Sequence, residues 1–236
     1  MTDLSVVVLC YHSGESIIPI YSRLDGLLQK MAIKYEIVLV ANDFAKSHDK
    51  TLDIVKSISV KNEKVIPVTE IKEGMMGWDM MTGMDAASGD IICVIDGDGQ
   101  FPLESIEQGY NLIIQNQCDL VKTYRINRQD GFYRKTISMV YNILFGLLFP
   151  GLDSKDVNSK PKLLRKDVYK KLNLSSNDWF IDAEIMIRAR DLSLNIREFP
   201  IPFLPNNSRK SFVRFGAIFE FIFNLIRFRL KNPHNR

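Results

Sequence analysis

Short runs of β-branched residues alternate with helical patterns through the first half of the chain. The runs expected to form strands are Leu4–Leu9, Tyr35–Ala41, Lys64–Val68, Ile91–Ile95 and Asp119–Tyr124. Helices are expected between them at Ser16–Met31, Asp49–Ser59, Gly77–Ala87 and Leu103–Gln115. Because parallel strands buried on both faces need continuous apolar runs and helical crossovers, this alternation predicts a doubly wound α/β sheet. Ligands of such sheets bind beyond the carboxyl ends of the strands.

The second half of the chain is dominated by helical patterns. Helices are expected at Tyr133–Phe149, Arg165–Leu172, Asp182–Leu192 and Phe212–Lys231, and a polar loop is expected at Asp153–Lys162. The run Ile196–Phe203 contains prolines, so we expect it to form a strand at an edge of the sheet. These patterns divide the chain into a main domain, residues 1–205, and a basic amphipathic terminal helix, residues 206–236.

Composition and charge narrow the class of protein. The 236 residues are 46% hydrophobic and 25% charged, as in ordinary globular domains. The net charge of +3 gives no argument for a nucleic-acid partner. Cys10, Cys93 and Cys118 fit neither a disulfide framework nor a metal site, which favours a reducing, cytosolic compartment. We expect neither a signal peptide nor a helix that spans a membrane.

Asp96 and Asp98 are separated by one residue and follow the buried run Ile91–Ile95 directly. Two carboxylates at the carboxyl end of a strand can share a divalent cation such as Mg²⁺ or Mn²⁺, and Gln100 is a candidate third oxygen ligand. A cation there would bridge the oxygens of a diphosphate and neutralise charge on a leaving nucleotide. The alternative is an acidic, glycine-rich turn without a ligand.

Polar motifs follow the other strands in a distinctive order. They are Cys10-Tyr11-His12-Ser13-Gly14-Glu15, Asn42-Asp43, Glu73-Gly74-Met75-Met76-Gly77, Thr82-Gly83-Met84-Asp85-Ala86-Ala87-Ser88-Gly89-Asp90 and Asp96-Gly97-Asp98-Gly99-Gln100-Phe101-Pro102. This set resembles the nucleotide-diphosphate-sugar glycosyltransferases of family 2, most closely the polyprenyl-phosphate branch that includes dolichyl-phosphate mannose synthase. The resemblance implies a GT-A fold, which is a Rossmann-like, doubly wound mixed sheet flanked by helices. It also implies a nucleotide-sugar half, about 1–125, and an acceptor half, about 126–205.

The resemblance implies which residues bind the nucleotide-diphosphate sugar. They are Tyr11, Ser13, Asn42, Asp43, Gly74, Asp96 and Gln100, with Asp98 as a catalytic residue and Asp96, Asp98 and Gln100 as metal ligands. Asp43 would accept hydrogen bonds from the base, and a turn-capping role is its alternative. The chain departs from the family pattern at His12, which replaces Asn, and at Met76, where a basic residue is common. These departures leave the identity of the nucleotide open.

On the acceptor side, basic and hydroxyl side chains would hold a phosphate group. The candidates are Arg125, Arg134, Ser159, Lys160 and Ser211. Asp182 and Glu184 resemble the family's acidic pair, one of which would be the general base. Asp182 could instead cap its helix, or position an acceptor phosphate that is already anionic at pH 7.

Two of the expected helices are mostly apolar and carry one narrow polar stripe each. The stripe is Arg134, Ser138, Asn142 and Gly146 in the first helix and Glu220, Asn224, Arg227 and Lys231 in the second. Such wide apolar faces with basic flanks are typical of helices that lie in the headgroup region of a membrane with their polar stripe in water. The alternative is that the two helices pack on each other or in a homo-oligomer.

These expectations combine into one function. We expect an inverting, metal-dependent glycosyltransferase that moves a sugar from a nucleotide-diphosphate sugar to a polyprenyl phosphate. It would be cytoplasmic and peripheral on the inner face of the membrane. One rival is a glycosyltransferase that acts on a saccharide hydroxyl in polysaccharide synthesis. A second rival is a non-catalytic sugar-nucleotide-binding membrane protein.

Overall fold

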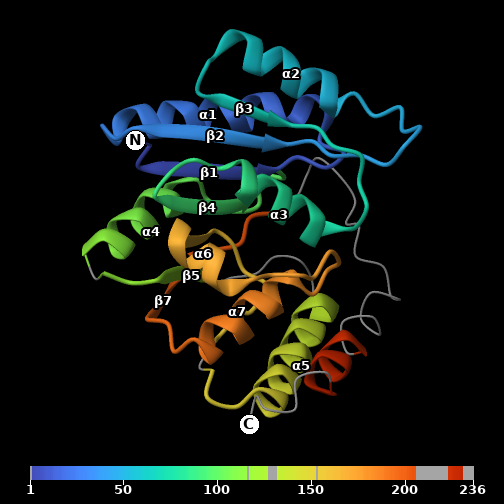
Figure 1. The fold of residues 1–236 in the computed structure, drawn as a ribbon, viewed down its shortest axis with the longest axis vertical. Helices are drawn as coiled ribbons and strands as arrows, with labels where there is room; N and C mark the ends of the chain where they lie inside the picture. The colour runs from blue at the N-terminus through green and yellow to red at the C-terminus, as the bar shows by residue number, and fades with distance from the viewer. Residues whose placement is uncertain (1, 116, 127–131, 153, 206–222, 231–236) are drawn as a thin grey trace.

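One mixed sheet of seven strands runs through the centre of the molecule (Figure 1). The computed structural model describes residues 2–115, 117–126, 132–152, 154–205 and 223–230. The strands are β1 (Leu4–Leu9), β2 (Tyr35–Val40), β3 (Val65–Val68), β4 (Ile91–Asp96), β5 (Leu120–Ile126), β6 (Lys162–Arg165) and β7 (Ile196–Pro202). Their order in the sheet is β3-β2-β1-β4-β6-β5-β7. The predicted doubly wound mixed sheet is thus confirmed.

The strand β6 is the element that the sequence did not predict. It is antiparallel to both β4 and β5, whereas the four strands from β1 to β4 are parallel to their neighbours among themselves. The expected loop took Lys162 and the expected helix took Arg165, while Leu163 and Leu164 between them were assigned to no element. Since β6 pairs Lys162 with Val94 near the carboxyl end of β4, the segment before β6 reaches the carboxyl edge of the parallel strands. β7 pairs only with β5, at the edge that its prolines predicted.

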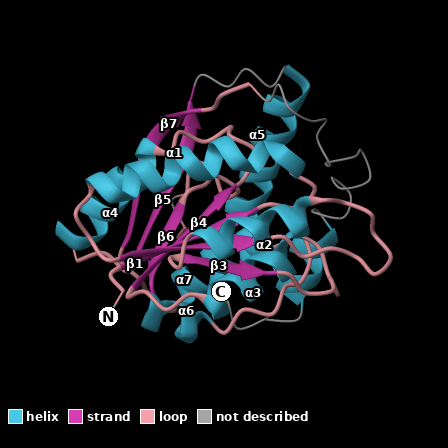
Figure 2. Ribbon diagram, turned by 90° about the horizontal axis from the view of Figure 1, so that it is seen from above, coloured by secondary structure: helices cyan, strands magenta, loops and turns pink. Residues whose placement is uncertain are grey.

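Helices cover both faces of the sheet (Figure 2). They are a short 3₁₀ helix η1 (Gly14–Ser16), α1 (Ile17–Lys30), α2 (Thr51–Lys61), α3 (Met76–Ala86), α4 (Glu104–Gln115), α5 (Phe132–Leu148), α6 (Lys166–Leu172) and α7 (Ile181–Asp191). One core layer packs α1, α2 and α4 against the sheet, and the other packs α3, α5, α6 and α7. Successive residues of β1 alternate between the layers, because Val6 and Val8 lie in the first and Val7 in the second.

Residues 223–230 form a helical segment that lies beside α5 in Figure 1. Leu225 is fully buried, and the ring of Phe228 contacts Phe180 at a centroid distance of 5.2 Å. The rest of the terminal unit predicted at 206–236 lies outside the described residues. No described helix is long and apolar enough to cross a membrane.

The expectation that the polar stripes of the two apolar helices face water is wrong at two positions. Asn142 on α5 accepts a hydrogen bond from the backbone N–H of Val157 at 3.1 Å. Asn224 donates to Asp178 Oδ2 at 2.9 Å. Both amides therefore face the protein, because buried backbone and carboxylate groups need partners there. Both helices also expose large apolar side chains, among them Ile143 on α5 and Ile226 on the segment 223–230.

Candidate active site

The paired carboxylates lie where β4 ends and a tight turn begins. Asp96 is the last residue of β4, and its side chain is 26% exposed. The N–H of Gly97 donates to Leu9 O at 2.9 Å, which ties the turn to the end of β1. A Cβ on Gly97 would lie 2.8 Å from that same oxygen, so only glycine fits. Asp98 Oδ1 accepts a hydrogen bond from the N–H of Gln100 at 3.0 Å and steadies the turn.

Gln100 also has a structural role, which its amide nitrogen and its backbone provide. The side chain is 9% exposed, and its Nε2 donates to Leu204 O at 3.0 Å. The N–H of Leu204 returns a hydrogen bond to Gln100 O at 2.9 Å. This reciprocal pair fastens the carboxylate turn to the segment that follows β7. Because the side-chain bond uses Nε2 and not the amide oxygen, Asp96, Asp98 and Gln100 all stay predicted metal ligands.

A buried cluster of charges lies next to Asp96. Lys160 Nζ is 3.0 Å from Asp182 Oδ2 and 3.5 Å from Asp96 Oδ1. Lys162 Nζ donates to Asp182 Oδ1 at 2.5 Å and also to the backbone oxygens of Val157 and Ser159, at 2.9 Å each. The cluster joins the two halves of the domain, since Asp96 belongs to the first and the other charged groups to the second.

Burial and neighbouring charges shift the pKa values of Asp182, Lys160 and Lys162 in different directions. Burial alone would raise the pKa of Asp182, but the two ammonium groups lower it to about 2. Burial would lower the pKa of Lys160, but the charges of Asp182 and Asp96 outweigh it and raise the pKa above its ordinary value. At Lys162 burial prevails and lowers the pKa to about 8. Asp182 is thus an ionised, fully buried carboxylate held by two lysines, and it does not face the open site as a general base would.

Two other predicted acceptor residues, Arg125 and Ser159, are engaged within the protein. Arg125 donates from Nε and Nη2 to the two carboxylate oxygens of Asp156, at 2.7 and 2.9 Å. Ser159 is fully buried with its Oγ 2.7 Å from Thr123 Oγ1. Arg134 lies on α5, but its side chain is outside the described residues, as is Ser211 altogether. Arg125 and Ser159 therefore do not form the open phosphate site that was expected.

Glu184, the other predicted acid of the acceptor side, has a structural role. Its fully buried carboxylate accepts hydrogen bonds from the N–H groups of Ser175 and Ser176, at 3.0 and 2.8 Å. These bonds shape the loop of residues 175–178. The described contacts of Glu184 are thus those of a residue that holds this loop, and its catalytic role stays a prediction.

The loop of residues 175–178 caps α3, which explains the predicted glycine-rich turn. Asn177 O accepts a hydrogen bond from the N–H of Met75 at 2.7 Å, and Asp178 O accepts one from Gly77 at 2.9 Å. A Cβ on Gly74 would lie 2.5 Å from Asn177 O. Gly74 is therefore needed for contact with this loop. The expectation that it binds the nucleotide sugar is not supported, because a protein loop already occupies the free N–H groups of α3.

Aromatic and charged side chains meet beyond β1, β2 and β3. Lys72 forms a buried ion pair with Asp79, and its Nζ lies 4.1 Å from the centroid of the Tyr11 ring. His12 Nε2 lies 3.2 Å from Asp43 Oδ1. We call these five residues, Tyr11, His12, Asp43, Lys72 and Asp79, the donor pocket. The sequence analysis missed Lys72, although its position between β3 and the glycine-rich turn places it at the same edge of the sheet.

The other two predicted donor residues support this pocket from behind. Asn42 is buried, and its side chain bridges Thr82 Oγ1 at 2.8 Å and the N–H of Glu70 at 2.7 Å. Ser13 is buried as well, with its Oγ 3.5 Å from Gly97 O. Asn42 therefore joins the ends of β2 and β3, and Ser13 lies against the carboxylate turn. Neither has the exposure expected of a contact with substrate.

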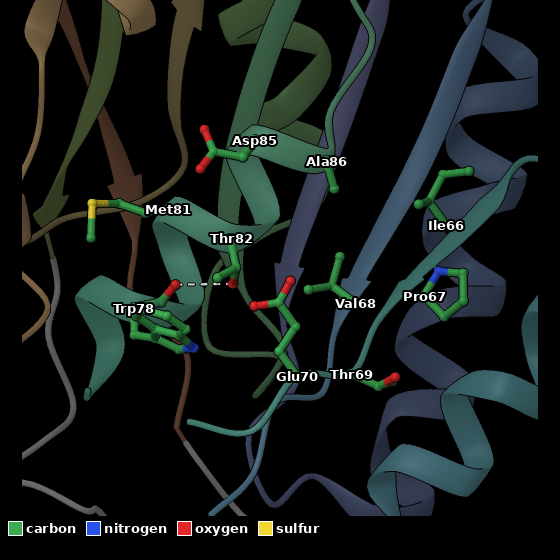
Figure 3. A pocket seen from close by; sticks show the side chains of 10 residues that line it. All are labelled: Ile66, Pro67, Val68, Thr69, Glu70, Trp78, Met81, Thr82, Asp85 and Ala86. Carbon is green, nitrogen blue, oxygen red and sulfur yellow. Dashed lines mark hydrogen bonds between the residues drawn. The ribbon is translucent and has the colours of Figure 1, made fainter. Parts of the chain in front are cut away.

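A cleft of about 730 Å³ lies between β3 and α3, but it does not contain the chemistry. Figure 3 shows its lining, in which Thr82 Oγ1 donates to Trp78 O at 2.9 Å. None of the predicted site residues lines this cleft. The carboxylate turn and the donor pocket remain the better candidate, because they gather charged groups at the carboxyl edge of the sheet.

Asp96 and Asp98 fit a divalent cation that brings ligands of its own. Within the described residues, no three acidic, histidine or cysteine side chains form a group that could hold a metal. Mg²⁺ commonly takes only one or two carboxylates from a protein and completes its shell with water and substrate phosphates. Two carboxylates, one of them partly exposed, are sufficient for that kind of site.

The sequence and the fold place the chain in a known family. The model of Glycosyl transferase family 2 matches residues 5–173. The chain belongs to this family. It is 30% identical over 233 residues to the dolichol-phosphate mannosyltransferase of Pyrococcus furiosus, covering 95% of this chain. It is 29% identical over 140 residues to the undecaprenyl-phosphate 4-deoxy-4-formamido-L-arabinose transferase of Aeromonas hydrophila, covering 59% of this chain.

The chain spans 63% of the length of the first relative and 42% of the second. Among solved structures, it resembles glucosyl-3-phosphoglycerate synthase from Mycobacterium tuberculosis in complex with Mn²⁺, UDP and phosphoglyceric acid. That match has a TM-score of 0.73 at 15% identity and covers 97% of this chain and 78% of the other. The family 2 resemblance and the GT-A-like fold predicted from the motifs are therefore confirmed.

Proposed function

We propose that this family 2 protein transfers a sugar from a nucleoside-diphosphate sugar to a polyprenyl phosphate, with inversion at the sugar carbon. The observation that carries the proposal is the position of Asp96 and Asp98 at the carboxyl end of β4, on the same edge as the donor pocket. A bound divalent cation would supply charge neutralisation at the leaving diphosphate. Asp96 and Asp98 would hold it, and Asp43 would orient the base as a hydrogen-bond acceptor.

The engagement of the acidic residues favours a phosphate over a saccharide hydroxyl as the acceptor. A hydroxyl acceptor needs a general base within hydrogen-bond reach, whereas a phosphate is already ionised at neutral pH. Asp182 and Glu184 are both fully buried and occupied by protein donors. A phosphate acceptor requires neither of them as a base. The names of the relatives from Pyrococcus furiosus and Aeromonas hydrophila support the same acceptor class.

We propose that the protein works at the cytoplasmic face of a membrane without crossing it. The exposed apolar side chains Met139, Val140, Ile143 and Leu147 lie on α5, and Phe223, Ile226 and Leu230 lie on the adjacent helical segment. We call these seven side chains the apolar surface. Arg227 and Arg229 stand in the same segment and suit anionic headgroups. A lipid-linked acceptor would thus reach the protein at the surface where its chain is embedded.

The substitution Asp98→Ala tests the reaction. With UDP- and GDP-sugars, Mn²⁺ and a polyprenyl phosphate, we expect wild type to form a lipid-linked sugar and the variant to lose at least about a hundredfold in turnover, the scale of removing one electrostatic contact to the transition state. The matched control is Asp90→Ala, which removes an exposed carboxylate before the amino end of β4 and should leave turnover unchanged.

Three outcomes would contradict the proposal or a part of it. Transfer by wild type to a saccharide hydroxyl but not to the lipid phosphate would support the rival transferase. Binding of nucleotide without transfer or hydrolysis under any of these conditions would support a non-catalytic protein. Metal-dependent turnover retained by a folded Asp98→Ala variant would remove the metal site from this turn.

A further inference from the structure

Lys160 is placed differently from what an acceptor-binding lysine requires. Its side chain is 2% exposed, and its Nζ lies between Asp182 and the metal-ligand candidate Asp96. The thioether of Met76 closes a further side, with Sδ 3.5 Å from the amine. To meet an acceptor phosphate, this amine would have to leave two carboxylates and a buried site. Its contacts thus direct it to the donor side of the domain.

The ammonium group of Lys160 neutralises part of the negative charge that would otherwise attract a divalent cation. Four charged groups pair with one another here, namely the carboxylates of Asp96 and Asp182 and the ammonium groups of Lys160 and Lys162. Asp98, a third carboxylate, follows on the turn. The three carboxylates and two ammonium groups leave one net negative charge for a cation of charge +2. An ammonium 3.5 Å from a ligand oxygen also repels that cation, and burial weakens the screening of this repulsion.

A nucleoside diphosphate would supply the negative charge that the protein groups lack for binding the cation. Its phosphate oxygens bring negative charge and further oxygen ligands, which Mg²⁺ and Mn²⁺ prefer. The cation would then be held by Asp96 and Asp98 together with the diphosphate, even with Lys160 in place. Lys162 supports Asp182 from the other side and has no contact with Asp96 among those described, so its effect on the cation is weaker.

We propose that Lys160 is a positioning residue that holds Asp96 as an ion pair in the nucleotide-free protein, so that a divalent cation binds this turn only together with a nucleoside diphosphate. The proposal rests on the donor class of the proposed function. Lys160, which the sequence analysis predicted to bind the acceptor, would instead control the order in which the metal and the nucleotide bind.

The experiment is a pair of titrations of the purified full chain, one with Mn²⁺ alone and one with Mn²⁺ in the presence of UDP or GDP. Electron paramagnetic resonance measures the concentration of free Mn²⁺ in both. We expect wild type to bind Mn²⁺ at least about tenfold more weakly without nucleotide than with it. Lys160→Met should tighten the nucleotide-free Kd for Mn²⁺ by at least about tenfold. The matched control Lys162→Met, which removes the same charge from the same carboxylate, should change it by less than about threefold.

A second variant protects the test against a failure of Lys160→Met to fold. The double variant Lys160→Met with Asp182→Asn removes both charges of the buried pair, and Lys162 keeps its two backbone acceptors. It should also bind free Mn²⁺ more tightly than Asp182→Asn alone, since the two differ only at Lys160. Circular dichroism reports whether each variant is folded.

Several results would overturn the inference. Equal nucleotide-free Kd values for wild type and Lys160→Met would do so, and so would equal Kd values for wild type with and without a bound nucleotide. The single-metal titration does not require a nucleotide. If neither UDP nor GDP binds but the Lys160 variants still tighten free Mn²⁺, the proposed donor class fails while the role of Lys160 at Asp96 stands.

Discussion

At the open end of the donor pocket, Asp43 shares one carboxylate oxygen between the N–H of Phe44, at 2.8 Å, and the imidazole of His12, at 3.2 Å. Burial alone would raise the pKa of Asp43, but hydrogen bonds from Ser47, Phe44 and His12 outweigh it and lower the pKa. The side chain is therefore an ionised acceptor at neutral pH. An acceptor-only group at this position suits the N–H groups of a base.

The substitution Asp43→Ala should weaken the binding of the nucleotide sugar more than it slows turnover. A base contact is made equally in the ground state and in the transition state, so its loss appears in KM. We expect KM to rise about tenfold, the value of one charge-assisted hydrogen bond, with kcat within about threefold of wild type. Steady-state kinetics measure both, and Asp53→Ala on the exposed side of α2 is the control. A large fall in kcat at constant KM would assign Asp43 to the chemical step instead.

At the scale of elements, α3 is held by a loop from the acceptor half of the domain. The carboxylate of Glu184 fixes residues 175–178, and their backbone oxygens accept hydrogen bonds from the start of α3. A helix N-terminus leaves N–H groups that need acceptors, and this loop supplies them. One buried acid of the acceptor half therefore stabilises the helix that lies behind the donor pocket.

The substitution Glu184→Gln should destabilise the fold because it removes the buried negative charge that accepts two backbone N–H bonds at Oε2. Its amide nitrogen also cannot accept the bond that the Ser175 hydroxyl donates to Oε1. We expect the free energy of unfolding to fall by roughly 2 kcal/mol, the scale of hydrogen bonds to a buried charged group. Urea unfolding measures the change. Asp191→Asn, at the exposed end of the same helix, should cost less than about 0.5 kcal/mol. An unchanged stability with lost turnover in Glu184→Gln would support the catalytic assignment.

At the scale of the whole molecule, the apolar surface is the feature on which the proposal of work at a membrane rests. The two helices bury one side against the sheet layers and direct their exposed large side chains outward. Exposed apolar area of this kind is typical of a contact with a membrane or another protein. The amides Asn142 and Asn224 face inward, and the exposed charge of Arg227 stands among the apolar side chains of residues 223–230.

The double substitution Ile143→Ser with Leu147→Ser should reduce membrane binding without unfolding the protein, because these side chains are 55% and 74% exposed. We expect sedimentation with anionic liposomes to fall several-fold and transfer to long-chain polyprenyl phosphate to fall with it. Transfer to a short, water-soluble phosphate acceptor should be unchanged. The control is Val60→Ser on α2, which removes an apolar side chain that is 88% exposed on another helix. A wild type that ignores liposomes but dimerises, and becomes monomeric in the variant, would identify the apolar surface as a homo-oligomer interface.

The elements themselves could be read from the sequence. The strands β1 to β5 and the helices between them follow from local periodicity, and each lies within a few residues of its expected bounds. The carboxylate turn could also be located, because a motif directly after a strand is placed by that strand alone. The prolines of β7 predicted its place at the edge for a similarly local reason.

The partners of the polar side chains depended on tertiary structure. Lys160 meets Asp96 only because β6 turns back between β4 and β5, and four residues are too few for periodicity to predict that strand. Glu184 holds a loop, Gln100 holds the segment after β7, and Asp182 is enclosed by two lysines. A sequence pattern identifies which residues are acidic or basic. Burial decides which of them must be paired inside the protein and which remain for a substrate, because an unpaired charge is costly away from water, and burial is a property of the packed chain.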